Sequence, residues 1–271
     1  METELEAFRA YLTGLERSEN TVSAYLWSVR IFFRQYREIS RENMLDFKKK
    51  QMEQWKPGTV NSRIAAMNRF CVFLGHEEYC VKGLRIHKGT SVENVITLSE
   101  YQRLIRGLQK DGNERGYWLV RFLAHTGARA GEFIRLTRDG LMTGYCEMWT
   151  KGKMRRIYIP ETLIRESQGY FQDCFQKTDT SLLFVNQRGG PLTARGMDAN
   201  LKRWAQKYGI RKEAAHAHAF RHLYALEFLK RNPNLALLAD LMGHSSVSTT
   251  SIYLRMSREE QMRQFNEASD W

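Results

Sequence analysis

Apolar residues three or four positions apart form long stripes in the first third of the chain, and these stripes constrain the fold more than any other feature. Such spacing is typical of amphipathic helices that bury one face in a shared core. It predicts roughly four or five helices between Leu5 and about Leu84, in a helical N-terminal domain of residues 1–88. The clearest stripes consist of Tyr25, Val29, Phe32, Phe33 and Tyr36, and of Val60, Ile64, Met67, Cys71 and Leu74.

The helical pattern stops between Val81 and Asn94, where glycine, lysine and hydroxyl residues follow one another without apolar periodicity. This composition favours a connection between domains, so we place a linker at 89–96 and a second domain at 97–271. The second domain is mostly helical by pattern. One segment, 145–160 (YCEMWTKGKMRRIYIP), has aromatic and β-branched residues on both sides of a glycine-containing turn. It predicts a β-hairpin or small sheet within a mainly α fold.

The chain carries 42 Lys and Arg against 30 Asp and Glu, a formal charge of +12. Both domains share the excess, so an anionic partner is expected, and nucleic acid first. There is no apolar run of membrane-spanning length, and the acidic start METELEAFRA is unlike a signal peptide, which predicts a cytoplasmic protein. The cysteines form no CxxC pair and no GxxxxGK loop occurs, so neither a metal nor a nucleotide cofactor is expected.

The motif HAFRH places His218, Arg221 and His222 at helical offsets of three and four. In a helix these side chains lie on roughly one face, so that two imidazoles and a guanidinium converge. A solvated basic helix end explains the motif equally well. A helical zinc site is a third interpretation, but the glutamate that follows the first histidine in HExxH is absent.

Two further motifs are ambiguous when each is taken alone. In TGARAGE, Arg129 begins a segment after a glycine and is explained by an ion pair with Glu132. In LMGHSS, His244 follows a glycine that ends one helix, and Tyr253 lies nine positions later. A tyrosine in a buried stripe is the ordinary interpretation of Tyr253. The combination of the motifs changes these interpretations.

In this order and spacing, the motifs resemble the signature of the tyrosine recombinases. The resemblance spans about residues 97–256, and the N-terminal part is similar, more loosely, to the SAM-like core-DNA-binding domain of that family. It implies a two-domain, C-shaped DNA clamp with a mostly helical catalytic domain. The residues that carry it are Arg129 in TGAR, Lys151 in TKGK, His218 and Arg221 in HAFRH, His244 in LMGHSS, and Tyr253 in TTSIY.

The resemblance implies a site-specific recombinase that cuts and rejoins DNA through a covalent 3′-phosphotyrosine, with Tyr253 as the nucleophile. Two guanidiniums, Arg129 and Arg221, suit the charge that develops on the non-bridging phosphate oxygens. By the same resemblance, His218 is the base and His244 binds a phosphate oxygen and seats the tyrosine.

A lysine at the tip of the hairpin is implied to protonate the leaving 5′ oxygen. We assign Lys151 to this role. Its interval to Pro160 is one residue longer than is usual in the family, so Lys153 remains an alternative.

The implied partners are double-stranded DNA with inverted-repeat core sites, further copies of the chain and accessory DNA-bending proteins. A dimer on each site and a tetramer in synapsis are expected. The C-terminal residues Met262, Phe265 and Trp271 either dock on a neighbouring protomer or pack on their own domain. The expected DNA contacts are Lys48, Lys49, Lys50, Arg63, Arg69 and Lys153. For the three consecutive lysines, Lys48 to Lys50, a solvated helix end is the alternative interpretation.

Two other functions use the same features. A type IB topoisomerase-like enzyme applies the same chemistry to one duplex, and a catalytically silent accessory protein keeps only the DNA clamp. Within the recombinases, the length fits the compact two-domain type of Xer proteins, integron integrases and the recombinases of mobile elements. The sequence leaves open the target DNA and the choice among integration, excision, inversion and dimer resolution.

Overall fold

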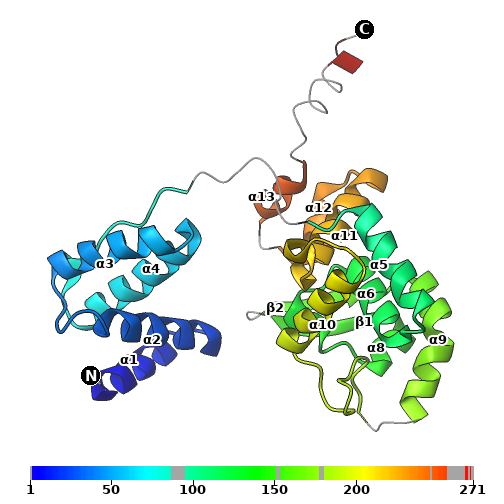
Figure 1. Cartoon of the computed structure of the whole chain (residues 1–271), viewed down its shortest axis with the longest axis horizontal. Coiled ribbons are helices and arrows are strands. Elements are labelled where there is room, and N and C mark those ends of the chain that lie inside the picture. Colours follow the sequence, from blue (N-terminus) through cyan, green and yellow to red (C-terminus); the bar gives the residue numbers. More distant parts are fainter. Residues whose placement is uncertain are drawn as a thin grey trace. The chain divides into compact units, whose positions relative to one another are not determined.

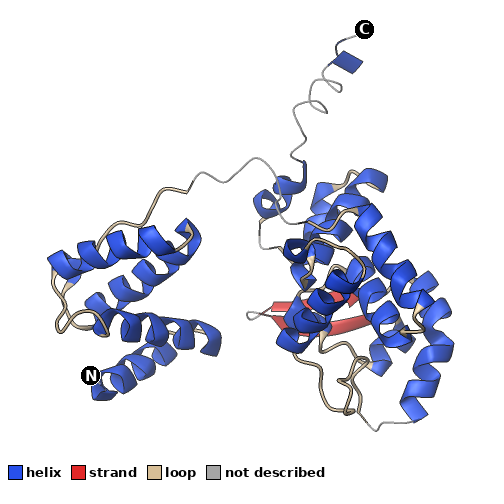
Figure 2. Cartoon of the chain, viewed as in Figure 1, coloured by secondary structure: helices blue, strands red, loops and turns tan. Residues whose placement is uncertain are grey.

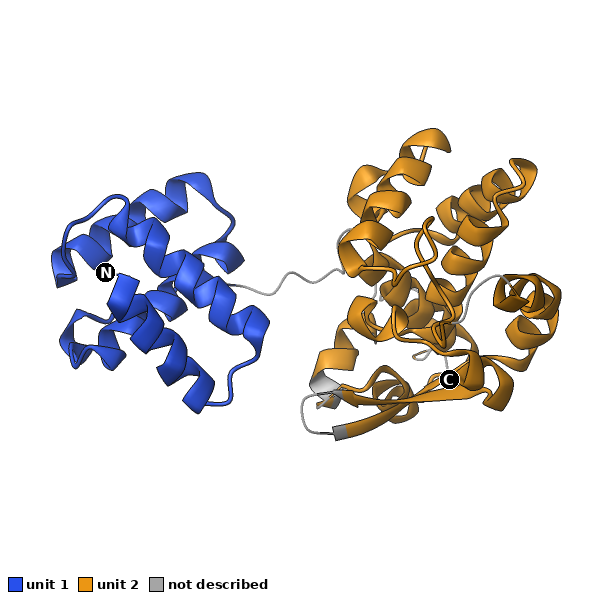
Figure 3. Cartoon of the chain, turned by 90° about the horizontal axis from the view of Figure 1, so that it is seen from below, with its two compact units in different colours: residues 1–88 blue, residues 89–271 orange. Residues whose placement is uncertain are grey.

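The structure is a computed structural model (Figure 1). It describes residues 2–86, 95–150, 153–176, 180–244, 246–254, 266, 267 and 269. The chain divides into two compact units, Met1–Lys88 and Gly89–Trp271 (Figure 3). Most of the predicted linker, residues 89–94, lies outside the described residues. Helices dominate both units, with one small sheet (Figure 2), so the predicted mainly α fold class is confirmed.

Unit 1 is a bundle of helices around an aromatic core. The fully buried rings of Phe8, Phe32, Phe47 and Phe70 come from four different helices, and Phe8 meets Phe70 edge to face with centroids 4.9 Å apart. Such contacts add to the hydrophobic gain of burial. The elements are α1 (Glu2–Gly14), α2 (Glu19–Phe33), α3 (Arg41–Gln54), α4 (Pro57–Phe73) and the short η1 (Glu77–Tyr79).

In unit 2, helices α6 and α11 pack against each other, and further helices and a hairpin complete the unit. Strands β1 and β2 pair antiparallel from Tyr145 opposite Tyr158 to Thr150 opposite Lys153. This confirms the predicted hairpin. The elements are α5 (Leu98–Lys110), α6 (Glu114–Thr126), α7 (Ala130–Phe133), α8 (Arg138–Thr143), β1 (Tyr145–Thr150), β2 (Lys153–Tyr158), α9 (Glu161–Gln176), α10 (Ala194–Lys207), η2 (Lys212–Ala214), α11 (Ala217–Arg231), α12 (Leu235–Met242), α13 (Val247–Thr250) and η3 (Ser251–Leu254).

Two glycine turns set the geometry of the site. Gly127 ends α6 at φ 60° and Gly243 ends α12 at φ 61°, a left-handed conformation that favours glycine. At Gly127 a Cβ would lie 2.5 Å from the ring of Tyr224, so no larger residue fits without rearrangement. The first turn leads to Arg129 and the second to His244.

No helix among the described residues combines the length and the apolar character needed to cross a membrane.

Candidate active site

Arg221 lies at the centre of the site and connects three segments of unit 2. Its side chain is only 1% exposed. It donates hydrogen bonds to the carbonyl oxygens of Gly127 (2.5 Å) and Met242 (2.6 Å) and to Nε2 of His244 (2.9 Å). Burial, followed by the charges of neighbouring arginines, lowers the pKa of Arg221 to about 10. The group therefore remains a fixed positive charge at neutral pH.

Arg129 reaches the same place from the start of α7. Its Nη2 donates to the carbonyl oxygen of Gly243 (2.7 Å), and its Nη1 donates to Glu132 (2.8 Å). The ion pair with Glu132 suggested by the sequence is present, but it is only one part of the arrangement. About 37% of the Arg129 side chain is exposed, so this guanidinium is open to an incoming anion.

Glu132 is the buried counter-charge of the cluster, at 2% exposure. It accepts hydrogen bonds from the backbone N–H of Arg129 (2.7 Å) and from Arg155. Burial alone would raise the pKa of Glu132, but the hydrogen bonds and positive charges of these two arginines outweigh it and lower the pKa. The carboxylate is therefore ionised at neutral pH.

Arg155 is a site residue that the sequence interpretation missed. It lies on β2, buried, and its Nη2 donates to the carbonyl oxygen of Leu241 (2.6 Å). A Cβ at Gly243 would lie 2.4 Å from Cδ of Arg155, so the glycine turn and the arginine are packed against each other. The alternation of residues along the strand could have identified Arg155, because it lies on the same inward face as Ile157 and Ile159.

His244 follows the Gly243 turn and has a defined protonation pattern. An arginine can only donate, so Nε2 of His244 accepts from Arg221 and the proton lies on Nδ1. Nδ1 then donates to Oγ1 of the buried Thr250 (2.7 Å). Burial and then the charges of Arg221 and Arg129 lower the pKa of His244 to about 4, so the imidazole is neutral at physiological pH.

Tyr253 lies in η3 with 7% of its surface exposed. Its Oη is 2.6 Å from Nδ1 of His222. Burial raises the pKa of Tyr253 to about 12, although the nearby positive charge of Arg221 opposes the shift. The phenol is therefore protonated in the free protein. His218 is solvent-exposed, and its ring centroid is 4.3 Å from that of His222.

The structure thus brings Arg129, Arg221 and His244 together, with Tyr253 beside them through His222. Lys151 lies outside the described residues, and of Lys153 only its place in β2 is described. The general acid therefore stays a prediction. Among the described residues, no group of three or more His, Cys, Asp or Glu side chains is placed to hold a metal ion.

The expected DNA contacts of unit 1 have different surroundings. Lys48 donates to the carbonyl oxygen of Lys82 (2.8 Å), and Lys50 pairs with Asp46 (2.8 Å). Lys49 is exposed and Arg69 is half-buried.

Arg63 requires a correction. It is 4% exposed, donates to Gln51 and lies between the rings of Trp27 and Trp55, 4.9 and 4.4 Å from their centroids. Its guanidinium is used inside the unit and is not presented to a DNA backbone, so the prediction that Arg63 makes a phosphate contact is wrong for this structure.

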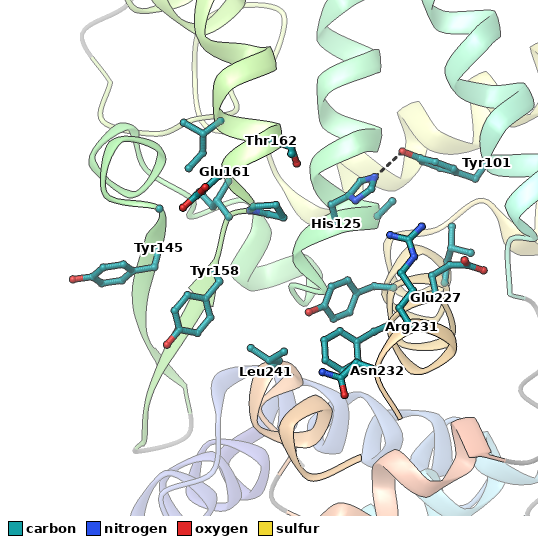
Figure 4. Close-up of a pocket in the computed structure, with 18 of the residues that line it drawn as sticks. Tyr101, His125, Tyr145, Tyr158, Glu161, Thr162, Glu227, Arg231, Asn232 and Leu241 are labelled. Carbon is teal, nitrogen blue, oxygen red and sulfur yellow. Dashed lines mark hydrogen bonds between the residues drawn. The ribbon is translucent and has the colours of Figure 1, made fainter. Parts of the chain in front are cut away.

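A cavity of about 1040 Å³ lies in unit 2, and neither Tyr253 nor Arg129, Arg155 and Arg221 line it. Figure 4 shows Tyr145 and Tyr158 of the hairpin on one side and Arg231 and Asn232 on the other. Tyr101 and His125 are joined by a hydrogen bond of 3.2 Å. The lining is mostly apolar and aromatic. No sequence pattern indicated this cavity.

Comparison with known proteins relates the whole chain to one group. Residues 94–260 match the phage integrase family. The tyrosine recombinase XerD of Staphylococcus haemolyticus is 26% identical, and the match covers 98% of each chain. The tyrosine recombinase XerA of Pyrococcus furiosus is 27% identical over 93% of this chain and 89% of its own length.

Two solved structures share the fold. The Tn1549 transposon integrase in complex with transposon right end DNA gives a TM-score of 0.75 at 15% identity, with 98% of each chain covered. The XerH site-specific recombinase bound to a palindromic difH substrate gives a TM-score of 0.72 at 19% identity, over 91% of this chain and 80% of its own.

Proposed function

The chain belongs to the phage integrase family and is a tyrosine recombinase like its relatives, and we propose that Tyr253 is the nucleophile with which it cuts and rejoins DNA. The observation that carries this proposal is the convergence of Arg129, Arg221 and His244 on the Gly243 turn beside Tyr253. Positive charge and hydrogen-bond donors gathered next to a buried phenol suit attack on a phosphodiester.

The chemistry follows from these groups. Oη of Tyr253 attacks the phosphorus, the bond to the 5′ oxygen breaks, and a 3′-phosphotyrosine forms. Arg129, which is partly exposed, binds the non-bridging oxygens directly, as a bidentate guanidinium can. Arg221 is already bonded to two carbonyl oxygens, so it supplies fixed charge and holds His244 in place. A hairpin lysine, Lys151 or Lys153, protonates the leaving 5′ oxygen.

The tyrosine linkage is itself a phosphodiester, so the 5′-hydroxyl of another strand can reverse the reaction without an external energy source. Attack by a strand from a second site converts cleavage into exchange. Exchange requires two DNA sites held together, which supports a dimer on each inverted-repeat site and a tetramer in synapsis. The cavity of Figure 4 has the apolar lining that a C-terminal segment with Phe265 and Trp271 would need on a neighbouring protomer.

The test is to incubate the purified chain with fragmented DNA from its own locus, trap adducts that survive denaturant, and sequence the attached ends. Wild type is expected to give adducts clustered at an inverted repeat, and Tyr253→Phe none. Adducts of equal yield from Tyr253→Phe would contradict the proposal. Relaxation of supercoiled DNA by a strict monomer, without products joining two sites, would favour the topoisomerase-like alternative.

A further inference from the structure

We propose that Thr250 is a positioning residue for strand cleavage. Its buried hydroxyl orients the ring of His244 and ties that histidine to the segment that carries Tyr253. This inference rests on the proposed function, because it assumes that a phosphodiester is cut beside His244 and Tyr253. The observation that carries it is the hydrogen bond of 2.7 Å between Nδ1 of His244 and Oγ1 of Thr250.

The burial of Thr250 indicates that its hydroxyl is needed. The residue ends α13 and has no exposed surface, whereas its neighbour Thr249 is exposed. Burying a hydroxyl costs free energy unless the group finds a hydrogen-bond partner. Valine has nearly the same shape and no polar atom, so it would fill the position at lower cost if packing were the only requirement. The hydroxyl of Thr250 therefore has a polar role, and its partner is His244.

The ring of His244 is held at both nitrogens. Nε2 accepts from Nη2 of Arg221 at 2.9 Å, and Nδ1 is bonded to Thr250. The backbone N–H of His244 is fixed separately, because it donates to the carbonyl oxygen of Ala239 at 3.0 Å. Thr250 thus acts on the side chain and not on the backbone of His244. An imidazole bonded on both sides keeps one ring orientation and one tautomer.

This orientation aims Nε2 at the expected phosphate position. Arg129, which is open to an incoming anion, donates to the carbonyl oxygen of Gly243, the residue directly before His244. Nε2 of His244 lies on the side of Arg221, the second guanidinium of the site. A phosphate bound by Arg129 would therefore approach the edge of the ring that bears Nε2, while Thr250 holds the opposite edge.

A hydroxyl suits both states of the site. Burial and the nearby arginines lower the pKa of His244 to about 4, so the ring is neutral and carries a single N–H. In the free protein Nε2 accepts from Arg221, whereas an anionic oxygen of the substrate requires a donor at Nε2. A hydroxyl can accept from Nδ1 in the first state and donate to it in the second. An ionised carboxylate in its place could only accept.

Thr250 also connects His244 to the nucleophile. It is followed at once by η3 (Ser251–Leu254), and Tyr253 lies three residues later. Tyr253 packs with Met242 in an apolar cluster, and α13 packs against both α12 and η3. A hydrogen bond is directional, so it limits sliding of this segment more sharply than apolar contacts do. Misplacement of reacting atoms by about 1 Å can cost about 10²-fold in rate.

The kinetic test compares three substitutions in the full chain, on the DNA fragment that wild type attacks. Thr250→Val keeps the shape and removes the hydroxyl, and we expect the rate of adduct formation at saturating DNA to fall by about 10–100-fold. The DNA concentration that gives half the maximal rate should stay the same. Thr250→Ser returns the hydroxyl and should recover most of the rate. Thr249→Val, the same change at the exposed neighbour, is the matched control and should react like wild type.

The hydrogen bond itself can be measured without DNA. Nuclear magnetic resonance of the full chain with ¹⁵N-labelled histidine reports the ring nitrogens, and His244→Gln identifies the resonances of His244. We expect a proton on Nδ1 that exchanges slowly with water in wild type and in Thr250→Ser. In Thr250→Val the Nδ1 resonance should shift and its proton should exchange faster, because the acceptor is gone.

Three results would overturn the inference. Thr250→Val would react at the rate of Thr249→Val, Thr250→Ser would stay as slow as Thr250→Val, or the Nδ1 resonance of His244 would be the same in wild type and Thr250→Val. Absence of adducts from wild type would instead contradict the proposed function. The resonance experiment would still decide whether Thr250 holds His244, so the two failures are distinguishable.

Discussion

Replacing Glu132 by Gln should destabilise unit 2 more than any surface substitution. The carboxylate is 2% exposed and faces two guanidiniums, Arg129 and Arg155. Glutamine keeps the size of the side chain and an acceptor for the backbone N–H of Arg129, but it removes the charge. Arg155 is then left buried beside Arg129 and Arg221 without a counter-ion. Removing one partner of such a buried pair costs about 3–5 kcal/mol of unfolding free energy.

Most of this loss belongs to Arg155, whose side chain is 8% exposed, because the partly exposed Arg129 is screened by water. The further change Arg155→Met removes the uncompensated buried charge. The double variant should therefore be more stable than Glu132→Gln alone, as expected for groups that interact directly.

The loss of stability caused by Glu132→Gln should also depend on pH. The pKa of Glu132 is lowered in the folded state from an ordinary value of 4.5. The Glu132 carboxylate therefore contributes fully to the stability of unit 2 above pH 4.5, and this contribution is lost as the pH falls through the lowered pKa of the folded state. Wild type and Glu132→Gln should accordingly converge in stability under acidic conditions.

The assay is urea unfolding of the full chain, read by hydrogen–deuterium exchange of peptides from α6 and α11, which reports unit 2 separately. Peptides from α2 and α4 provide the internal control, because unit 1 should be unchanged. A loss below about 1 kcal/mol at neutral pH, or a difference between the two proteins that does not narrow in acid, would refute this account of the cluster.

Further predictions concern single residues in both units. Gly243→Ala should cost unit 2 at least about 2 kcal/mol, since alanine is strained at positive φ and its Cβ would displace Arg155; Gly131→Ala, with open space around it, should be neutral in the same urea titration. Arg63→Ala should lower the stability of unit 1 by roughly 1–3 kcal/mol and change its tryptophan fluorescence, because the guanidinium contacts two indole rings. The side-chain hydrogen bond from Arg211 holds the pKa of Glu100 at about 2. The stability of unit 2 should therefore fall as the pH drops from 4.5 to 2, and Glu100→Gln should remove that part of the pH dependence.

The helices of unit 1 and the hairpin were predictable because periodicity reports burial directly. The sequence also singled out Arg129, Arg221, His244 and Tyr253, but local spacing could not show which groups touch. The contact between His222 and Tyr253 joins residues far apart in sequence. It depends on how η3 packs against α11.

Arg63 shows the opposite difficulty. A basic residue in a basic domain is expected to face DNA, yet two tryptophans from other parts of unit 1 enclose it. Arg155 was hidden among neighbouring basic residues, and only its place on the inward face of β2 distinguishes it. In both cases the role of the arginine is decided by tertiary packing, which the periodicity of the sequence does not show.

The most direct test of the central claim is to digest the denatured protein–DNA adduct with protease and nuclease and to locate the attached nucleotide by mass spectrometry. The account predicts a single modified peptide in which Tyr253 carries a phosphoryl group joined to a 3′ nucleotide. Attachment at another residue, or a phosphoryl group joined to a 5′ nucleotide, would contradict it.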